Sequence, residues 1–231
     1  SVAGPHARDT LARITDTDLS TPAFRFMDFR RLDLGMIPAL VGRISYSGEL
    51  GYELWVAPEY QRALYDRLMA AGGEFGIRPF GFRALMSLRL EKSYGTWFRE
   101  YRPIYTPAEA GITRYIKLDH DFIGRAAFEA DASGDGPARR LVMLVVEPDP
   151  DDPADVIGDE PIWHGDEAVG WVTSGGYGHS SGTSLALGYV PAELAELDGD
   201  GVFEIEIIGR RRPARLQREP VVDPQGLRMR Q

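Results

Sequence analysis

Hydrophobic positions in the first part of the chain recur with helical spacing in some segments and with strand spacing in others. In residues 4–15, Ala7, Leu11 and Ile14 fall on one side of a helix, and Pro5 suits its first turn. The same reasoning predicts strands over residues 24–34, 37–48 and 51–58. It predicts helices over residues 58–73 and 80–94. This mixture of helices and strands indicates an α+β fold for the first half of the chain.

Short strand-like segments follow a polar, glycine-rich run at residues 131–137. They are separated by Gly, Pro and Asp, and they cover residues 139–148, 160–165, 167–176, 184–191 and 201–217. Such spacing, with little helical pattern in between, is typical of a small β-barrel or sandwich. We therefore expect two domains, over residues 1–130 and 138–231.

Composition narrows the classes of function. The chain has 231 residues and a net charge of −9, which argues against nucleic-acid binding because such proteins usually carry a basic surface. Cysteine is absent, which excludes disulfides, thiolate nucleophiles and Cys-based metal sites. No apolar run approaches the roughly 18 residues of a membrane helix, and the first residues, SVAGPHARDT, lack the apolar stretch of a signal peptide. We expect no membrane association and a cytoplasmic location.

Glu53 is an unusual residue for its place in the sequence. It lies in the segment RISYSGELGYELWV, where a strand that begins at Tyr52 puts Glu53 and Trp55 together on the face opposite to Tyr52. A carboxylate buried beside an aromatic ring needs hydrogen-bond donors, because an unpaired buried charge is strongly destabilising. The donors could belong to an internal arginine such as Arg43 or Arg89, or to a ligand with two parallel N–H groups.

A second candidate region covers residues 87–111, SLRLEKSYGTWFREYRPIYTPAEAG, where charged and aromatic side chains interleave. It could be a helix end and loop held by surface ion pairs, or it could line a pocket for a flat anionic ligand. The histidines give no sign of a metal site. The four of them are scattered, without the short spacing that would let one helix or strand supply two metal ligands. We expect no metal site.

Several motifs of the chain resemble, in the same order, the tetrahydrofolate-binding aminomethyltransferase family, which includes the glycine-cleavage T-protein. They are RISYSGELGYELWV, LMSLRLEKSYGTWFRE, YTPAEAGI, LDHDFIGRAAF, GWVTSGGYG, SLALGYVP and REPVVDPQGLRMR. The resemblance covers nearly the whole chain and is greatest to the C-terminal folate half of dimethylglycine and sarcosine dehydrogenases. It implies an incomplete α+β folate-binding fold followed by a small C-terminal β-barrel.

The resemblance also implies site residues. In the family, the hairpin glutamate that matches Glu53 grips the pterin ring of folate, whose ring N–H and exocyclic amino group form a donor pair for a carboxylate. Tyr46 matches a folate-contacting tyrosine, and Leu54 and Trp55 follow in the same contact stretch. Two features depart from T-proteins. Leu85 stands where they carry a folate-contacting arginine, and the family's catalytic aspartate lies upstream of GPHARDTL, where no residue of this chain can match it.

The function implied by the resemblance is tetrahydrofolate-dependent one-carbon transfer by an aminomethyltransferase-like enzyme. A methylated amine of the dimethylglycine or sarcosine type would supply the methylene group of 5,10-methylenetetrahydrofolate. We expect the chain to be one segment of a longer polypeptide, with FAD only if an upstream flavin domain exists. The alternatives are a folate-dependent demethylase of a sulfonium or methoxyl substrate and a non-catalytic folate-binding or docking domain. Relatives that assist iron–sulfur assembly carry a characteristic cysteine, which this chain lacks.

Overall fold

A computed structural model of the chain describes residues 1–134, 136–197 and 203–231. Contacts between Cα atoms divide the chain into two compact units. The first unit comprises Ser1–Lys92 together with Asp223–Gln231, and the second comprises Ser93–Val222. The predicted domain boundary at residues 131–137 falls inside the second unit, and the division at that point stays a prediction.

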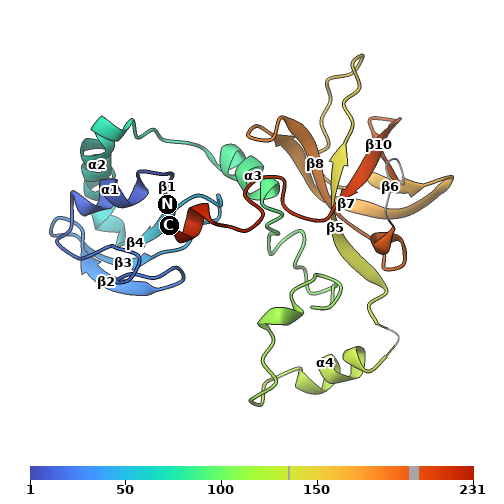
Figure 1. Ribbon diagram of the computed structural model, residues 1–231, viewed down its shortest axis with the longest axis horizontal. Coiled ribbons are helices and arrows are strands. Elements are labelled where there is room, and N and C mark those ends of the chain that lie inside the picture. Colours follow the sequence, from blue (N-terminus) through green and yellow to red (C-terminus); the bar gives the residue numbers. More distant parts are fainter. Residues whose placement is uncertain (135, 198–202) are drawn as a thin grey trace. The chain divides into compact units, whose positions relative to one another are not determined.

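The first unit contains a four-stranded antiparallel sheet in the order β1-β4-β3-β2 (Figure 1). Its strands are β1 Val2–Ala3, β2 Phe29–Asp33, β3 Pro38–Gly42 and β4 Gly51–Trp55. Its helices are α1 Ala7–Ala12, α2 Gln61–Gly72 and α3 Phe82–Glu91, with short 3-10 turns η1 Pro58–Tyr60, η2 Gly73–Phe75 and η5 Arg228–Arg230. The chain therefore returns to this unit with its last residues.

One face of the sheet forms the core of the first unit. Strand alternation points Val41 of β3 and Tyr52 of β4 to this face, and both are fully buried. Leu11 of α1 and Leu64 of α2 belong to the same buried cluster, so both helices cover this face. The helical stripe predicted within residues 4–15 is confirmed by the burial of Ala7 and Leu11, and Ile14, beyond the end of α1, packs partly buried against the same core.

Strand limits in the first unit differ from those the sequence predicts. The strand expected over residues 24–34 begins only at Phe29, because Phe24 turns into the core and Met27 adopts a left-handed backbone conformation with φ of 73°. The strand expected over residues 37–48 ends at Gly42, so residues 43–50 form a longer connection than a tight turn. The two predicted helices are confirmed, as η1 plus α2 and as a shorter α3.

The second unit contains a closed six-stranded barrel in the order β10-β5-β8-β7-β6-β9 (Figure 1). Its strands are β5 Arg139–Val146, β6 Pro161–His164, β7 Glu167–Gly178, β8 Thr183–Pro191, β9 Phe203–Ile207 and β10 Arg210–Gln217. The remaining elements are α4 Arg125–Ala132 and the 3-10 turns η3 Thr113–Tyr115 and η4 Leu194–Glu196. The α+β fold followed by a barrel is confirmed, and the sandwich alternative is wrong.

Glycines allow the barrel strands to approach one another closely. A Cβ atom added at Gly170 of β7 would lie only 2.0 Å from the backbone oxygen of Tyr189, and one at Gly188 of β8 would lie 2.7 Å from that of Trp171. These glycines therefore permit the curvature that closes the sheet. The last predicted strand is β9 plus β10, and its first two residues, 201 and 202, lie outside the described residues.

Candidate functional site

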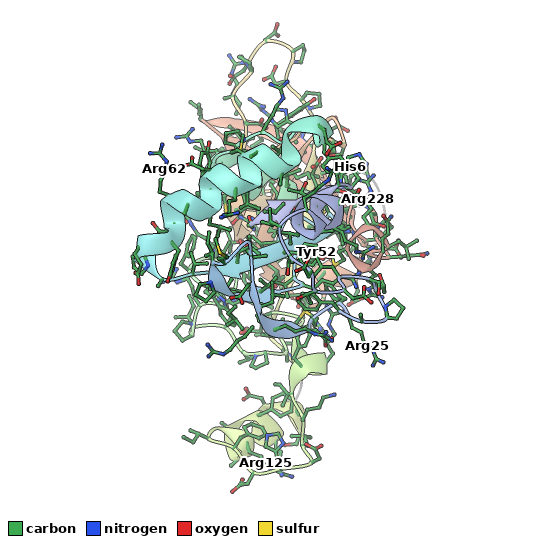
Figure 2. The ribbon with its side chains drawn as sticks, turned by 90° about the vertical axis from the view of Figure 1, so that its left-hand side faces the viewer. His6, Arg25, Tyr52, Arg62, Arg125 and Arg228 are labelled. Carbon is green, nitrogen blue, oxygen red and sulfur yellow. The ribbon has the colours of Figure 1, made fainter. Side chains whose placement is uncertain are left out.

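The hairpin of β3 and β4 carries Glu53 and Trp55 on the sheet face opposite to the core. Gly42 pairs with Glu53, and Leu40 pairs with Trp55, across the two strands. Tyr52, labelled in Figure 2, is fully buried, whereas Glu53 is half-buried and Trp55 is 43% exposed. The alternation predicted from the sequence is confirmed for these side chains, and Glu53 lies beside an aromatic ring as expected.

Neither Arg43 nor Arg89, the two candidate internal partners, pairs with Glu53. Across residues 1–134, 136–197 and 203–231, no hydrogen bond or ion pair involves the Glu53 carboxylate. The fully buried Arg43 donates from Nη1 to the backbone oxygen of Phe24 at 2.6 Å and from Nη2 to that of Gln231. Burial lowers the pKa of Arg43. Arg89 is buried on α3, and its contacts do not include Glu53.

Phe29 of β2 completes an aromatic wall beside this carboxylate. Its ring stacks on that of Trp55 with centroids 5.6 Å apart and an interplanar angle of 30°. Phe29 pairs with Gly42, which in turn pairs with Glu53, so the three residues form one row across the sheet. A Cβ atom at Gly42 would lie 2.6 Å from the Phe29 ring, so the absence of a side chain at Gly42 leaves room for this ring over β3. Sequence reasoning missed Phe29, although a glycine inside a strand is a signal of such close approach.

Tyr46 lies in the connection of residues 43–50, not in a strand, and it is half-buried. Two serines order this connection, because the hydroxyls of Ser45 and Ser47 lie 3.2 Å apart and share a hydrogen bond. The backbone N–H of Glu49 donates to the Ser47 hydroxyl at 3.4 Å. The connection is thus a structured loop, which we call the 45–50 loop.

The four predicted folate-binding residues occupy three different settings. Glu53 and Trp55 share the open face of the sheet, and Tyr46 stands in the loop that leads into β4. Leu54 points to the opposite face, where it packs against the core of the first unit. A half-buried carboxylate beside two stacked rings can accept paired hydrogen bonds from a flat heterocycle.

Four charged residues of the second candidate region are buried, so the interpretation as surface ion pairs is wrong for them. It holds for Arg99, whose Nη1 lies 2.9 Å from Oδ2 of Asp159, with the two side chains 41% and 78% exposed. Three of the buried residues lie at the end of the α3 segment with exposures of 4%, 1% and 4%: Arg89, Glu91 and Lys92. Glu100 in the second unit is fully buried, and its Oε2 accepts hydrogen bonds from the backbone N–H and the hydroxyl of Thr96, at 2.7 and 3.1 Å. Its Oε1 accepts one from the Ser174 hydroxyl at 2.6 Å. This glutamate holds its own segment in place.

In the part of the chain that the structure describes, no group of three or more His, Asp or Glu residues could hold a metal ion. His6 lies 3.0 Å from Asp9, and His120 lies 2.9 Å from Asp119, both at exposed positions. Among the described helices, none combines the length and the apolar character that spanning a bilayer requires.

Comparison with known families identifies both domains and their order along the chain. The profile of the GCVT N-terminal domain matches residues 1–120, and that of the glycine cleavage T-protein C-terminal barrel domain matches residues 139–223. The chain belongs to the glycine cleavage T-protein family. The resemblance seen in its motifs is therefore confirmed.

The relatives of this T-protein family chain include dehydrogenases and aminomethyltransferases. It is 44% identical over 223 residues to mitochondrial dimethylglycine dehydrogenase of Mus musculus, covering 96% of the chain and 25% of that protein. It is 35% identical over 210 residues to the aminomethyltransferase of Koribacter versatilis, covering 89% of the chain and 53% of that protein. The crystal structure of aminomethyltransferase T from Bartonella henselae superposes with a TM-score of 0.80 at 26% identity, covering 96% of this chain and 58% of that one. The chain thus spans about a quarter of the dehydrogenase and about half of the aminomethyltransferases.

Proposed function

We propose that this chain is a tetrahydrofolate-binding module for one-carbon transfer. The single observation that carries the proposal is the setting of Glu53, a half-buried carboxylate beside the stacked rings of Phe29 and Trp55. No hydrogen bond or ion pair within the described residues satisfies this carboxylate. A half-buried carboxylate without a protein donor stays hydrated, so both of its oxygens are available to accept hydrogen bonds from a ligand that displaces this water.

The residues present fit the pterin ring of tetrahydrofolate. The ring N–H and exocyclic amino group would donate to the two oxygens of Glu53, and the apolar ring faces would pack on the aromatic wall of Phe29 and Trp55. Tyr46 would contact the cofactor from the 45–50 loop. Because the Leu54 side chain packs in the core, we limit its proposed part to its backbone.

When bound, tetrahydrofolate supplies the nitrogen that accepts a one-carbon unit. We propose a methylated amine of the dimethylglycine or sarcosine type as the donor, with 5,10-methylenetetrahydrofolate as the product. The names of the relatives support this choice, since they include dimethylglycine dehydrogenase and sarcosine dehydrogenase. Protein residues of this chain would contribute binding and orientation, which can supply a large part of the rate of such a transfer.

Dehydrogenation of the amine would need a flavin. The two dehydrogenases are about four times longer than the matched region, which covers 25% of each, and this supports a flavin-bearing domain elsewhere in the same polypeptide. The cytoplasmic location stays a prediction, and both of these relatives are described as mitochondrial.

Titration of tetrahydrofolate, followed by quenching of tryptophan fluorescence, tests the proposal. We expect saturable binding, and we expect Glu53→Gln to weaken it about 10- to 100-fold, because hydrogen bonds to a charged group contribute about 1.5–3 kcal/mol. The matched control is Glu59→Gln, the same change at an exposed position in η1, which should leave affinity unchanged. An affinity of Glu53→Gln within about twofold of wild type, under 0.5 kcal/mol, would remove Glu53 as the pterin ligand.

A further inference from the structure

The last nine residues of the chain, 223–231, pack on the first unit through a buried ion pair. Lys92 donates from Nζ to the backbone oxygen of Asp223 and lies 3.4 Å from its Oδ2. The two side chains are only 3% and 10% exposed. Asp223 also organises its own segment, because its carboxylate accepts the backbone N–H groups of Leu227 at 3.0 Å and Arg228 at 3.2 Å. We call residues 223–231 the tail.

The rest of the tail is attached at three further points. Met229 is buried, with 5% of its surface exposed. Arg8 and Arg43 both donate from Nη2 to the backbone oxygen of Gln231. Arg228, labelled in Figure 2, donates from Nη1 to Oε1 of Glu49 at 2.6 Å. Ion pairs, a buried apolar side chain and guanidinium contacts together fix the tail against this unit.

Two of these contacts reach the 45–50 loop directly. Glu49 is a residue of that loop, so the bond from Arg228 holds the loop from one side. Gly48, with φ of +83°, lies under the stem of Lys92, and a Cβ atom there would be 2.5 Å from Lys92 Cγ. The loop is therefore clamped between the Lys92 stem and the tail, two residues away from Tyr46.

We propose that the tail is a latch that positions the 45–50 loop for ligand binding, with Arg228 and Lys92 as positioning residues. The inference rests on the proposed function, in which Tyr46 in the loop and Glu53 just beyond it hold the cofactor. A loop that is ordered before binding loses less conformational freedom when the ligand arrives, so affinity is higher. The motif REPVVDPQGLRMR lies outside the hairpin in the sequence, and under this proposal it helps to position the loop of that hairpin.

The experiment uses the full chain and the substitution Arg228→Ala, with three readouts. Hydrogen exchange at the amides of residues 47–50 reports the latch itself, tetrahydrofolate titration reports its effect on binding, and the thermal midpoint reports general stability. We expect faster exchange in the loop and binding weaker by about fivefold, equivalent to about 1 kcal/mol. The thermal midpoint should stay within about 2 °C, because the Arg228–Glu49 pair is partly exposed, at 50% and 29%.

Three variants control this result. Arg230→Ala changes the same residue type in the same 3-10 turn, where the Arg230 guanidinium lies over the Phe26 ring, and it should alter neither exchange nor binding. Arg228→Lys should retain part of the affinity, since an ammonium can still pair with Glu49. The exchanged pair Glu49→Arg with Arg228→Glu should restore both loop protection and affinity.

Each negative outcome has a distinct meaning. Unchanged loop exchange in Arg228→Ala would overturn the latch. Faster exchange with unchanged folate affinity, in a wild-type chain that binds folate, would overturn the positioning role alone. A wild-type chain that does not bind folate would overturn the proposed function, and the exchange data would then still decide whether the tail holds the loop.

Discussion

Ser174→Ala tests whether Glu100 is a structural residue of the second unit. The Ser174 hydroxyl is the donor to Oε1 of Glu100, at 2.6 Å, and the two residues are 5% and 0% exposed. Tyr189, whose pKa is raised by burial, donates its hydroxyl proton to the Glu100 backbone oxygen at 2.7 Å. Removing Ser174 Oγ takes one donor from a fully buried carboxylate that water cannot reach.

The loss should cost about 2 kcal/mol, within the range of about 1.5–3 kcal/mol for hydrogen bonds to charged groups. For a domain of this size that corresponds to a fall in thermal midpoint of about 4–8 °C. Differential scanning calorimetry measures this fall, with Ser133→Ala as the control, because that hydroxyl is exposed and donates to the Ala130 backbone oxygen. A midpoint for Ser174→Ala equal to that of Ser133→Ala would contradict the structural assignment of Glu100.

Two further predictions follow from close contacts and from a shifted pKa. Gly170→Ala should destabilise the barrel by more than about 3 kcal/mol, because the added Cβ would collide with the Tyr189 backbone. Gly73→Ala is the control: its Cβ would meet no atom within 4 Å, so it should be neutral or stabilise the protein by up to about 1 kcal/mol. Chemical denaturation of both variants would decide. Burial raises the pKa of Asp223, but hydrogen bonds from backbone N–H groups and the charge of Lys92 outweigh this effect and hold the pKa below its ordinary value. Asp223 thus stabilises the fold above its unfolded pKa, and this contribution is lost as pH falls through the lower folded value. The midpoint difference between wild type and Asp223→Asn should therefore be larger at about pH 6 than at about pH 3, and a difference independent of pH would contradict the assignment.

Local patterning is sufficient to predict which face of β4 each side chain occupies. The period of two assigns Glu53 and Trp55 to one face and Tyr52 to the core, and the structure agrees. The period of two does not locate the start of β2. Phe24 looks like a strand residue in the pattern, but it fills the core ahead of the strand. An apolar residue at this position fits both a buried residue outside a strand and the inward-facing residue of a strand.

Contacts between distant parts of the chain had no signal in the pattern. Glu49 and Arg228 are separated by 179 positions, and each alone looks like an ordinary charged residue near a turn. The sequence around Lys92 does not predict its burial either. Lysine is rarely buried unless it is paired, and the partner Asp223 lies 131 residues away. The family resemblance predicts the hairpin residues, whereas only the folded structure brings the tail and the loop together.

In the proposed function, Glu53 accepts hydrogen bonds from a bound heterocycle. The most direct measurement compares the affinities of wild type and Glu53→Gln for tetrahydrofolate and for an analogue that lacks the exocyclic amino group of the pterin. We predict that wild type prefers tetrahydrofolate by about tenfold and that Glu53→Gln binds both ligands nearly equally, a coupling of about 1.4 kcal/mol. The same preference in both proteins would show that this carboxylate and that amino group do not interact, and would contradict the account.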